Sequence, residues 1–398
     1  MAILIDITRS RIYNKYLISE VFMMEKCKLD NVLDFYIMGN KLKTMIIDEV
    51  NDYSVADNIF GSMMLAVAFD SEYKECENIG KLLQLMVLDA IQRLYPDYNV
   101  FDSLTEKWNI SVRSKDDALN YERLIFKYRS LDFALTDFII NKSNNLNIYD
   151  IQKELMRIFK PGNFEEYNKY KEIFRFYKKS FNLKNKIRSG WDSKHWNVKA
   201  LRVESVSEHV VGTIALAMAM KYEFGYNINI DEVVKLLAIH EIGEAIFGDI
   251  TPFDGITPED KKEIEHRAMR EVLGNLSDND LLLNILFNFD NKPYNEDVFA
   301  YFCDKLEADL QSKIYQDSEV HHSLDDQAGN CVFASSKAQE ILNNGAKTAF
   351  DVWYFYDLPI YENNQDFPEF SDLLNYIKEN NLVKKEDEQV KKRMLLHK

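Results

Sequence analysis

Long apolar runs separated by short polar breaks dominate the second half of the chain. Residues 206–221 are almost wholly apolar and Gly225 follows as a helix stop, while a second apolar helix is expected from Asn229 to about 247. Thr257-Pro258 predicts another helix start with proline in the first turn, and residues 297–315 predict a further helix. Glycine (13) and proline (7) are too scarce for the many turns of a β-sandwich or barrel. The pattern predicts an all-α fold.

The two halves of the chain resemble each other. Residues SVADNIFGSMMLAVAF and SVSEHVVGTIALAMAM share Ser-Val, Gly and Leu-Ala-x-Ala at the same places, and Asn58 stands where the second segment has His209. Similar blocks in the same order pair 35–50 with 176–191, 54–69 with 205–220 and 80–91 with 234–245. Chance similarity between amphipathic helices is the alternative, but three collinear blocks favour a duplication. The first copy has apolar residues opposite His240-Glu241.

A length of 398 residues suggests two domains. Pro161-Gly162 punctuates the chain between 150 and 170. We therefore expect a first domain at residues 1–165 and a second at 166–398, the latter ending in a helical extension. All seven histidines lie in the second expected domain, from His195 onwards, so imidazole chemistry is expected only there.

Composition narrows the class of protein. The net charge is −16, from 49 Lys+Arg against 65 Asp+Glu, which argues against general nucleic-acid binding. We expect no membrane span, because no apolar run approaches the ~18–20 residues that one requires, and the start of the chain lacks the order of a signal peptide. The four cysteines follow no C-x-x-C pattern and predict reduced thiols in a cytoplasmic protein. Rossmann and P-loop signatures are absent, and a homodimer is left open.

A local basic stretch stands out against the acidic total. Residues 165–202 contain eleven Lys or Arg and four acids. Such a stretch is expected to draw an anion into a site, although an exposed basic helix explains the lysines equally well. Arg188 is the best single candidate, because a guanidinium forms paired hydrogen bonds with phosphate.

Polar residues interrupt the apolar segment AIHEIGEAIFGDITP (238–252). In a continuous helix, His240, Glu241 and Glu244 share one flank. His209 and Asp304 interrupt two other apolar segments. A single buried histidine is more often a hydrogen-bonded core residue than a ligand, but buried carboxylates are costly unless paired or bound to metal. Imidazole beside carboxylate predicts one divalent transition metal (Co, Mn, Fe, Ni or Zn).

In this order, these residues resemble the signature of the HD-domain metal-dependent phosphohydrolases, and the context is similar to the 5′-deoxyribonucleotidase branch. The motifs that carry the resemblance are Arg188-Ser189-Gly190-Trp191, Glu204 to His209, His240 to Glu244, Gly248 to Pro252 and Asp304-Lys305-Leu306-Glu307. The resemblance covers about 175–320 and, through the internal repeat, 35–95 in degraded form. It implies two tandem HD-like helical domains, the N-terminal one degenerate and without metal ligands.

The resemblance also implies roles for individual residues. The implied metal ligands are His209, His240, Glu241 and Asp304, and the implied acid/base or water-orienting carboxylate is Glu244. The implied substrate-binding residues are Arg188 and Trp191 for the phosphate and base, Asp249 for the sugar end of the pocket, and Lys305. Trp191 could be a core aromatic residue or could stack on the base of a nucleotide, and stacking is favoured. The aromatic segment 353–364 is expected to pack the C-terminal helices or to form a pocket rim.

One motif departs from the family pattern. Its second motif is normally His-Asp, whereas this chain has His240-Glu241. Glutamate keeps the charge and the oxygen donor and adds about 1 Å of reach, so metal binding is expected to be retained. The function implied is release of phosphate from a (deoxy)nucleoside 5′-monophosphate. The alternatives are a dNTP or signalling-nucleotide phosphohydrolase, and a catalytically impaired nucleotide-sensing module.

Overall fold

Helices make up most of the protein. The computed structural model describes residues 28–95, 107–108, 110, 114–142, 148–251, 253–321, 323–327 and 329–384. A helix at 28–44 leads into a two-stranded antiparallel sheet of β1 (Ile46–Asp48) and β2 (Tyr53–Ser54). The following helices up to the central break of the chain are α2 (Val55–Tyr73), α3 (Ile79–Leu94), α5 (Lys115–Lys142) and α6 (Ile148–Phe159).

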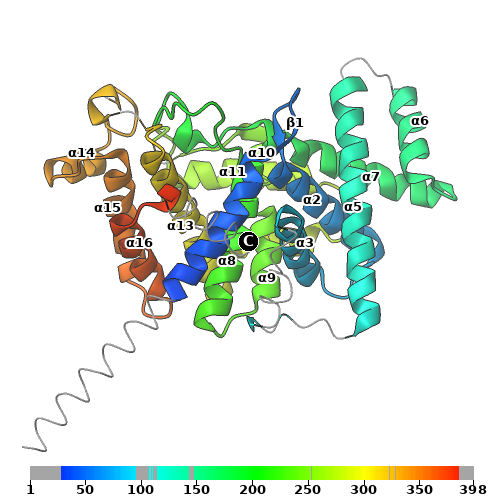
Figure 1. Ribbon diagram of the computed structural model, residues 1–398. Coiled ribbons are helices and arrows are strands. Elements are labelled where there is room, and N and C mark those ends of the chain that lie inside the picture. Colours follow the sequence, from blue (N-terminus) through cyan, green and yellow to red (C-terminus); the bar gives the residue numbers. More distant parts are fainter. Residues whose placement is uncertain are drawn as a thin grey trace, which may run out of the picture.

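The described residues of the second part of the chain are mostly helical. Its α-helices are α7 (Phe164–Ser180), α8 (Val206–Phe224), α9 (Ile230–Ile239), α10 (Glu244–Phe247), α11 (Pro258–Leu273), α12 (Asn279–Asn291), α13 (Asn295–Asp317), α14 (Ser336–Asn343), α15 (Ala349–Glu362) and α16 (Glu369–Glu379). Three 3-10 helices complete it: η2 (Phe181–Asn185), η3 (Ser189–Trp191) and η4 (Leu324–Gln327). Figure 1 shows α8 and α9 in the middle, with α14 to α16 on one side and α5 to α7 on the other.

Two helices buried on every side, α2 and α8, pack against each other at the centre. Each begins with a capping box, in which Ser54 pairs with Asp57 and Ser205 pairs with Glu208. The Ser205 hydroxyl donates to Asp57 Oδ1 at 3.0 Å, so the two caps meet. A helix that is predominantly apolar and capped at one end can be surrounded by other helices.

Around this pair, α3 packs against α9, and α13 packs against α8, α9 and α15. One hydrophobic core runs through these helices and contains residues from Leu29 to Leu382. Two predicted helix ends are confirmed: Gly225 ends α8 in the left-handed conformation (φ 73°), and Pro258 begins α11. A mostly helical protein is therefore confirmed. The tandem arrangement of two domains stays a prediction.

One predicted helix is wrong in extent. The sequence suggested a continuous helix to about 247, but α9 ends at Ile239. Beyond it the backbone turns more tightly, with the N–H of Ile242 donating to the carbonyl of Ile239 at 3.1 Å and that of Glu244 donating to Glu241 at 3.0 Å. These i to i+3 bonds are tighter than α-helical bonds and rotate the polar residues relative to a regular helix.

Two buried ion pairs link segments that lie far apart in the chain. Lys43, at the end of helix 28–44, pairs with Glu307 on α13. Lys184, in η2, pairs with Asp132 on α5 at 2.7 Å. All four side chains are at most 4% exposed. Each pair lies against a helical glycine, because a Cβ at Gly61 would lie 1.7 Å from Asp132 Oδ1 and one at Gly212 would lie 2.5 Å from Glu307 Oε1.

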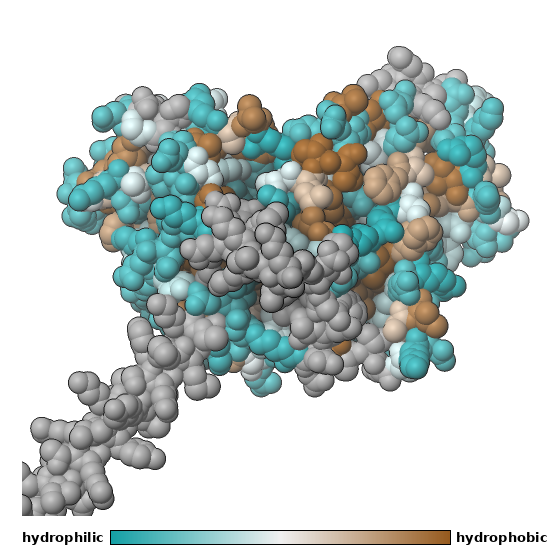
Figure 2. Space-filling model, in the orientation of Figure 1, coloured by the Kyte–Doolittle hydropathy of each residue, from teal (hydrophilic) through white to brown (hydrophobic). Residues whose placement is uncertain are grey.

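The surface mixes polar residues with separate apolar patches (Figure 2). On the outer helices the exposed large apolar residues include Phe126 and Phe133 of α5 and Phe164 of α7. Among the described residues, none of the helices combines the length and hydrophobicity that a bilayer crossing requires.

The Asp132–Lys184 pair is expected to be important for stability. Asp132→Ala should lower the free energy of unfolding by about 3–5 kcal/mol, because it leaves the Lys184 ammonium buried without its carboxylate. Urea unfolding followed by circular dichroism measures the change. The control is Glu154→Ala, which removes the partner of the largely exposed Arg157 and should shift the midpoint little. Equal destabilisation by the two variants would contradict the importance of the buried pair.

Candidate metal centre and substrate cavity

Three separate stretches bring the four predicted metal ligands together. His209 lies in the first turns of α8, and Asp304 lies midway along α13. His240 ends α9, and Glu241 follows in the tight turn. The packing of α13 against both α8 and α9 closes the cluster.

The ligand atoms of these four residues all lie within 4.8 Å of one another. His209 Nε2 is 2.9 Å from Asp304 Oδ1 and 3.6 Å from Glu241 Oε1. His240 Nε2 is 3.5 Å from Glu241 Oε1 and 3.6 Å from Asp304 Oδ1. Two imidazole nitrogens and two carboxylate oxygens are a donor set that suits a divalent transition metal.

The hydrogen bonding of His240 fits a metal ligand. Its Nδ1 lies 2.7 Å from the carbonyl oxygen of Leu237, so Nδ1 carries the proton and Nε2 has the lone pair. His240 Nε2 is buried and has no hydrogen-bond partner in the part of the chain that the structure describes. A buried nitrogen lone pair facing two carboxylates, with nothing to donate to it, needs a cation or a proton between them. The residues present therefore fit a metal ion.

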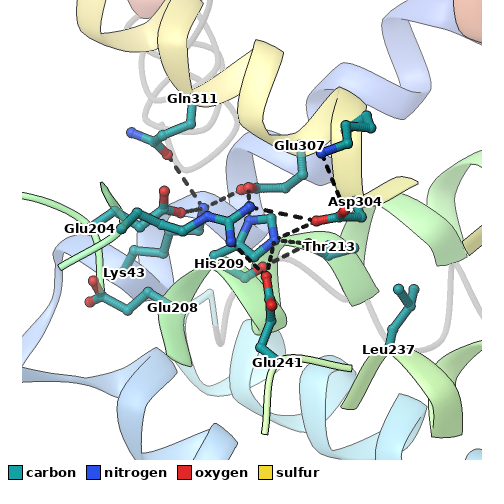
Figure 3. Close-up of polar contacts among 12 residues, drawn as sticks. Lys43, Glu204, Glu208, His209, Thr213, Leu237, Glu241, Asp304, Glu307 and Gln311 are labelled. Atoms are coloured by element: carbon teal, nitrogen blue, oxygen red, sulfur yellow. Dashed lines mark hydrogen bonds and ion pairs between the residues drawn. The ribbon is translucent and has the colours of Figure 1, made fainter. Parts of the chain in front are cut away.

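His209 is held from its other side by a residue to which the sequence analysis assigned no role (Figure 3). Its Nδ1 is 2.6 Å from Glu307 Oε2, which turns Nε2 towards Asp304 and Glu241. Although burial and the Arg188 charge oppose it, the charge of Glu307 and the hydrogen bonds to Asp304 and Glu307 raise the pKa of His209 to about 9. The sequence could have pointed to Glu307, because it follows Asp304 by three residues and therefore lies on the same face of α13.

The predicted acid/base residue, Glu244, lies beside the cluster at the start of α10. Burial, with the nearby charges of Asp249 and Glu241, raises its pKa well above the ordinary value. Its Oε2 is buried and has no hydrogen-bond partner. Glu241 differs, because His240 and Arg188 overcome the effect of burial and hold its pKa at about 2. One carboxyl thus favours its protonated form and its neighbour favours its charged form, the separation that acid/base chemistry requires.

Arg188 reaches the same group of carboxylates. Its Nη1 donates to Glu241 Oε1 at 2.6 Å, and its Nη2 lies 3.6 Å from Asp304 Oδ1. Its Nη1 is 3.8 Å from Asp249 Oδ2. Asp249 also accepts the backbone N–H of Ser189 at 2.8 Å, which fixes the turn that follows Arg188. The guanidinium thus lies within reach of any phosphate that contacts the cluster.

A cavity of about 690 Å³ opens onto this cluster. All the predicted substrate-binding residues (Arg188, Trp191, Asp249 and Lys305) line it. Trp191 is only 2% exposed, and its indole N–H donates to Glu204 Oε2 at 2.9 Å, so most of its surface contacts protein. Segment 353–364 forms part of the rim through Trp353, Tyr356, Asp357 and Ile360.

The predicted basic stretch does not build this cavity. Of its eleven cations, only Arg188 lines the cavity. Lys184 is buried against Asp132, and Arg202 pairs with Asp57 and Glu208. The other cations of the cavity are lysines from later helices and turns, which sequence reasoning missed apart from Lys305: Lys261, Lys262, Lys292, Lys305 and Lys337. Apart from the adjacent Lys261 and Lys262, these lysines are far apart in sequence, so no local run of basic residues indicates them.

Comparison with known proteins agrees with this geometry. The sequence profile of the HD domain matches residues 181–342, which include all four clustered residues. The human 5′-deoxynucleotidase HDDC2 is 32% identical over 152 residues, covering 37% of this chain and 71% of the human protein. The Dictyostelium discoideum HDDC2 is 28% identical over 35% of this chain and 76% of its own. The 5′-deoxynucleotidase hdd1 of Schizosaccharomyces pombe is 26% identical over 34% and 67%.

The chain therefore belongs to the HD-domain phosphohydrolases, in the family that includes these 5′-deoxynucleotidases. The similarity lies in the second part of the chain, where the His/Asp/Glu cluster is consistent with a metal site. Of the quoted motifs, Pro252 lies outside the described residues, as do His322 and His397 elsewhere in the chain.

A carboxyl pair beside the cavity should make stability depend on pH. Burial and the Asp357 charge raise the pKa of Asp309 well above its ordinary value, and burial raises the pKa of Asp357 to about 6. Both values exceed those of the unfolded chain, so the folded protein holds an additional proton, and this stabilisation is lost as pH rises through about 6. Asp309→Asn should reduce that loss in urea unfolding between about pH 5 and pH 7.

The matched control for this titration is the exposed Asp366→Asn, which should follow the wild-type pH profile. An Asp309→Asn profile as steep as that of the wild type would show that the pair does not titrate in this range.

Proposed function

We propose that this protein binds one divalent transition metal through His209, His240, Glu241 and Asp304 and releases phosphate from a deoxynucleoside 5′-monophosphate. The observation that carries the proposal is the convergence of these four ligand atoms within 4.8 Å of one another, with three of the residues (His240, Glu241 and Asp304) lining a cavity of about 690 Å³. The names of the related 5′-deoxynucleotidases support the substrate class. A cavity of this size accommodates a nucleotide.

The metal, when bound, would polarise the phosphoryl group and lower the pKa of a water molecule towards neutrality. The side chains around it supply the remaining steps. Glu244, whose raised pKa favours its protonated form, donates its proton to the leaving group. Arg188 and Lys305 bind phosphate oxygens, and Asp249 shapes the sugar end of the cavity while holding the Arg188 turn.

Glu241 replaces the aspartate usual at this position, and we propose that it still ligates the metal. Because the backbone leaves the α-helix at residue 240, the longer side chain starts from a turn and its Oε1 comes within 3.6 Å of both imidazole Nε2 atoms. The extra methylene is thus accommodated without moving the carboxylate out of the cluster.

A second candidate substrate is a nucleotide with more than one phosphate. The lysines that line the cavity in addition to Lys305 favour it: Lys261, Lys262, Lys292 and Lys337. Several ammonium groups can neutralise a longer phosphate chain than one guanidinium can. Comparing dNMP and dNTP hydrolysis under the same conditions distinguishes the two candidates.

We further propose that residues 1–165 are a degenerate HD-like copy and that residues 166–398 are the active copy. Matching contacts support this. The N–H of Val55 donates to the carbonyl of Met45 at 2.8 Å, and that of Val206 donates to Lys186 at 2.8 Å. The capping boxes of α2 and α8 also match. We place the protein in the cytoplasm, supported by the free thiols of the three described cysteines.

His240→Ala is expected to abolish phosphate release and to lower bound metal, because it removes a ligand nitrogen that has no other partner. The assay is phosphate release from a panel of dNMPs and dNTPs with Co²⁺, Mn²⁺, Fe²⁺, Ni²⁺ or Zn²⁺, alongside metal analysis of the purified protein. Circular dichroism should show a folded variant. A wild-type protein that binds none of these metals and releases no phosphate would refute the proposal.

Asn58→Ala tests the first copy. Asn58 stands where the second copy has His209, and its side chain donates to Asp132 at 2.6 Å, away from the cavity. The variant should therefore keep the wild-type kcat, with any loss confined to stability. A fall in kcat at saturating substrate, measured on folded protein, would contradict the assignment of this copy as catalytically inactive.

A further inference from the structure

We propose that Lys43, in the N-terminal helix 28–44, is a positioning residue for the metal ligand His209 and acts through Glu307. This inference rests on the proposed function, since it takes His209 as a metal ligand. Lys43 lies 138 residues before the start of the region that matches the HD domain at 181 (181 − 43). Helix 28–44, which carries Lys43, therefore lies outside the region that matches the HD domain.

The carboxylate of Glu307 is completely buried, and its two oxygens accept hydrogen bonds from different partners. Oε2 accepts the Nδ1–H of His209 at 2.6 Å. Oε1 accepts the Tyr36 hydroxyl at 2.8 Å and the Lys43 ammonium. Figure 3 shows Lys43 and His209 on the two sides of Glu307. The N-terminal helix thus holds one oxygen and leaves the other oriented towards the imidazole.

The orientation of Glu307 matters for the metal because imidazole has two nitrogens. A hydrogen bond from Nδ1–H to a fixed carboxylate places the lone pair on Nε2, the nitrogen that faces Asp304 and Glu241. A carboxylate free to rotate would leave the ring held through Nε2, which lies 2.9 Å from Asp304 Oδ1 and 3.4 Å from Thr213 Oγ1, with its Nδ1 side unsupported. The ligand geometry therefore depends on what fixes Glu307.

Lys43 is the cation that fixes it. Its ammonium also pairs with Glu204 and donates to Gln311 Oε1 at 3.3 Å. Glu204 in turn accepts the indole N–H of Trp191, a residue of the cavity wall. Without Lys43, the buried carboxylates of Glu204 and Glu307 would face each other with no ammonium between them, and such groups rearrange or admit water. One amine therefore supports both the metal ligand and the cavity wall.

The protein contains its own control for this role. Lys184 occupies the equivalent place in the repeat, pairing with Asp132 at 2.7 Å, and Asp132 accepts the Tyr177 hydroxyl at 2.6 Å. The side chain that donates to Asp132 where His209 donates to Glu307 is Asn58, an amide. Removing Lys184 thus disturbs a buried ion pair of the same kind without touching a partner of the metal ligands.

The test titrates the full-length metal-free protein with Co²⁺ and follows its visible absorption, which reports both affinity and ligand geometry. Lys43→Met should weaken Co²⁺ binding by about 10–100-fold and change the absorption spectrum, in line with the loss of outer-shell partners in other sites. Lys184→Met should keep wild-type affinity and spectrum, although both variants lose unfolding stability. A milder pair, Tyr36→Phe and Tyr177→Phe, repeats the comparison by removing one hydroxyl each.

Wild-type Co²⁺ affinity and spectrum in folded Lys43→Met would overturn the inference, as would an equal loss in Lys184→Met. If Lys43→Met does not fold, weaker Co²⁺ binding by Tyr36→Phe than by Tyr177→Phe supports the inference, and equal binding overturns it. A wild-type protein that binds neither Co²⁺ nor Mn²⁺, Fe²⁺, Ni²⁺ or Zn²⁺ and releases no phosphate refutes the proposed function instead, so the two failures are distinguishable.

Discussion

Buried carboxylates need a counter-ion, and much of this structure is organised by that need. A carboxylate that leaves water loses hydration that only a cation, a proton or several hydrogen bonds replace. Asp132 receives Lys184, and Glu204 and Glu307 share Lys43. Around the candidate metal centre, Arg188 lies among the carboxylates of Glu241, Asp249 and Asp304. The pairs determine which helices lie together as well as the charge of the site.

The need of buried carboxylates for counter-ions also connects the two parts of the chain. The cations that neutralise α13 and α5 come from segments far away in sequence, and each approaches through the space left by a helical glycine. A segment without histidines therefore contributes to the surroundings of a histidine site. The hydrophobic core, which is continuous between the two parts, provides the rigid packing that keeps these polar contacts in register.

The region that matches the HD domain contains the candidate metal centre, but some of the residues around this centre lie outside the matched region. The HD domain region holds the ligand cluster and the cavity residues that precede 342, whereas Trp353, Tyr356 and Asp357 of the cavity rim lie beyond it. The helix of Lys43 and Tyr36 precedes it. Segments on both sides of the matched region thus line part of the cavity or contact residues next to the candidate metal centre.

Local signals in the sequence determined the helical fold, the caps of α8 and α11 and the residue types of the cluster, because apolar periodicity, capping and proline act over a few neighbouring residues. Only the tertiary structure decided the rest. The end of α9 at Ile239 arises where the chain turns into the site. The partners of Lys184 and the lysines of the cavity are chosen by packing across many residues, and the Lys43–Glu307 pair spans 264 positions. No pattern of neighbouring residues encodes a contact at that separation.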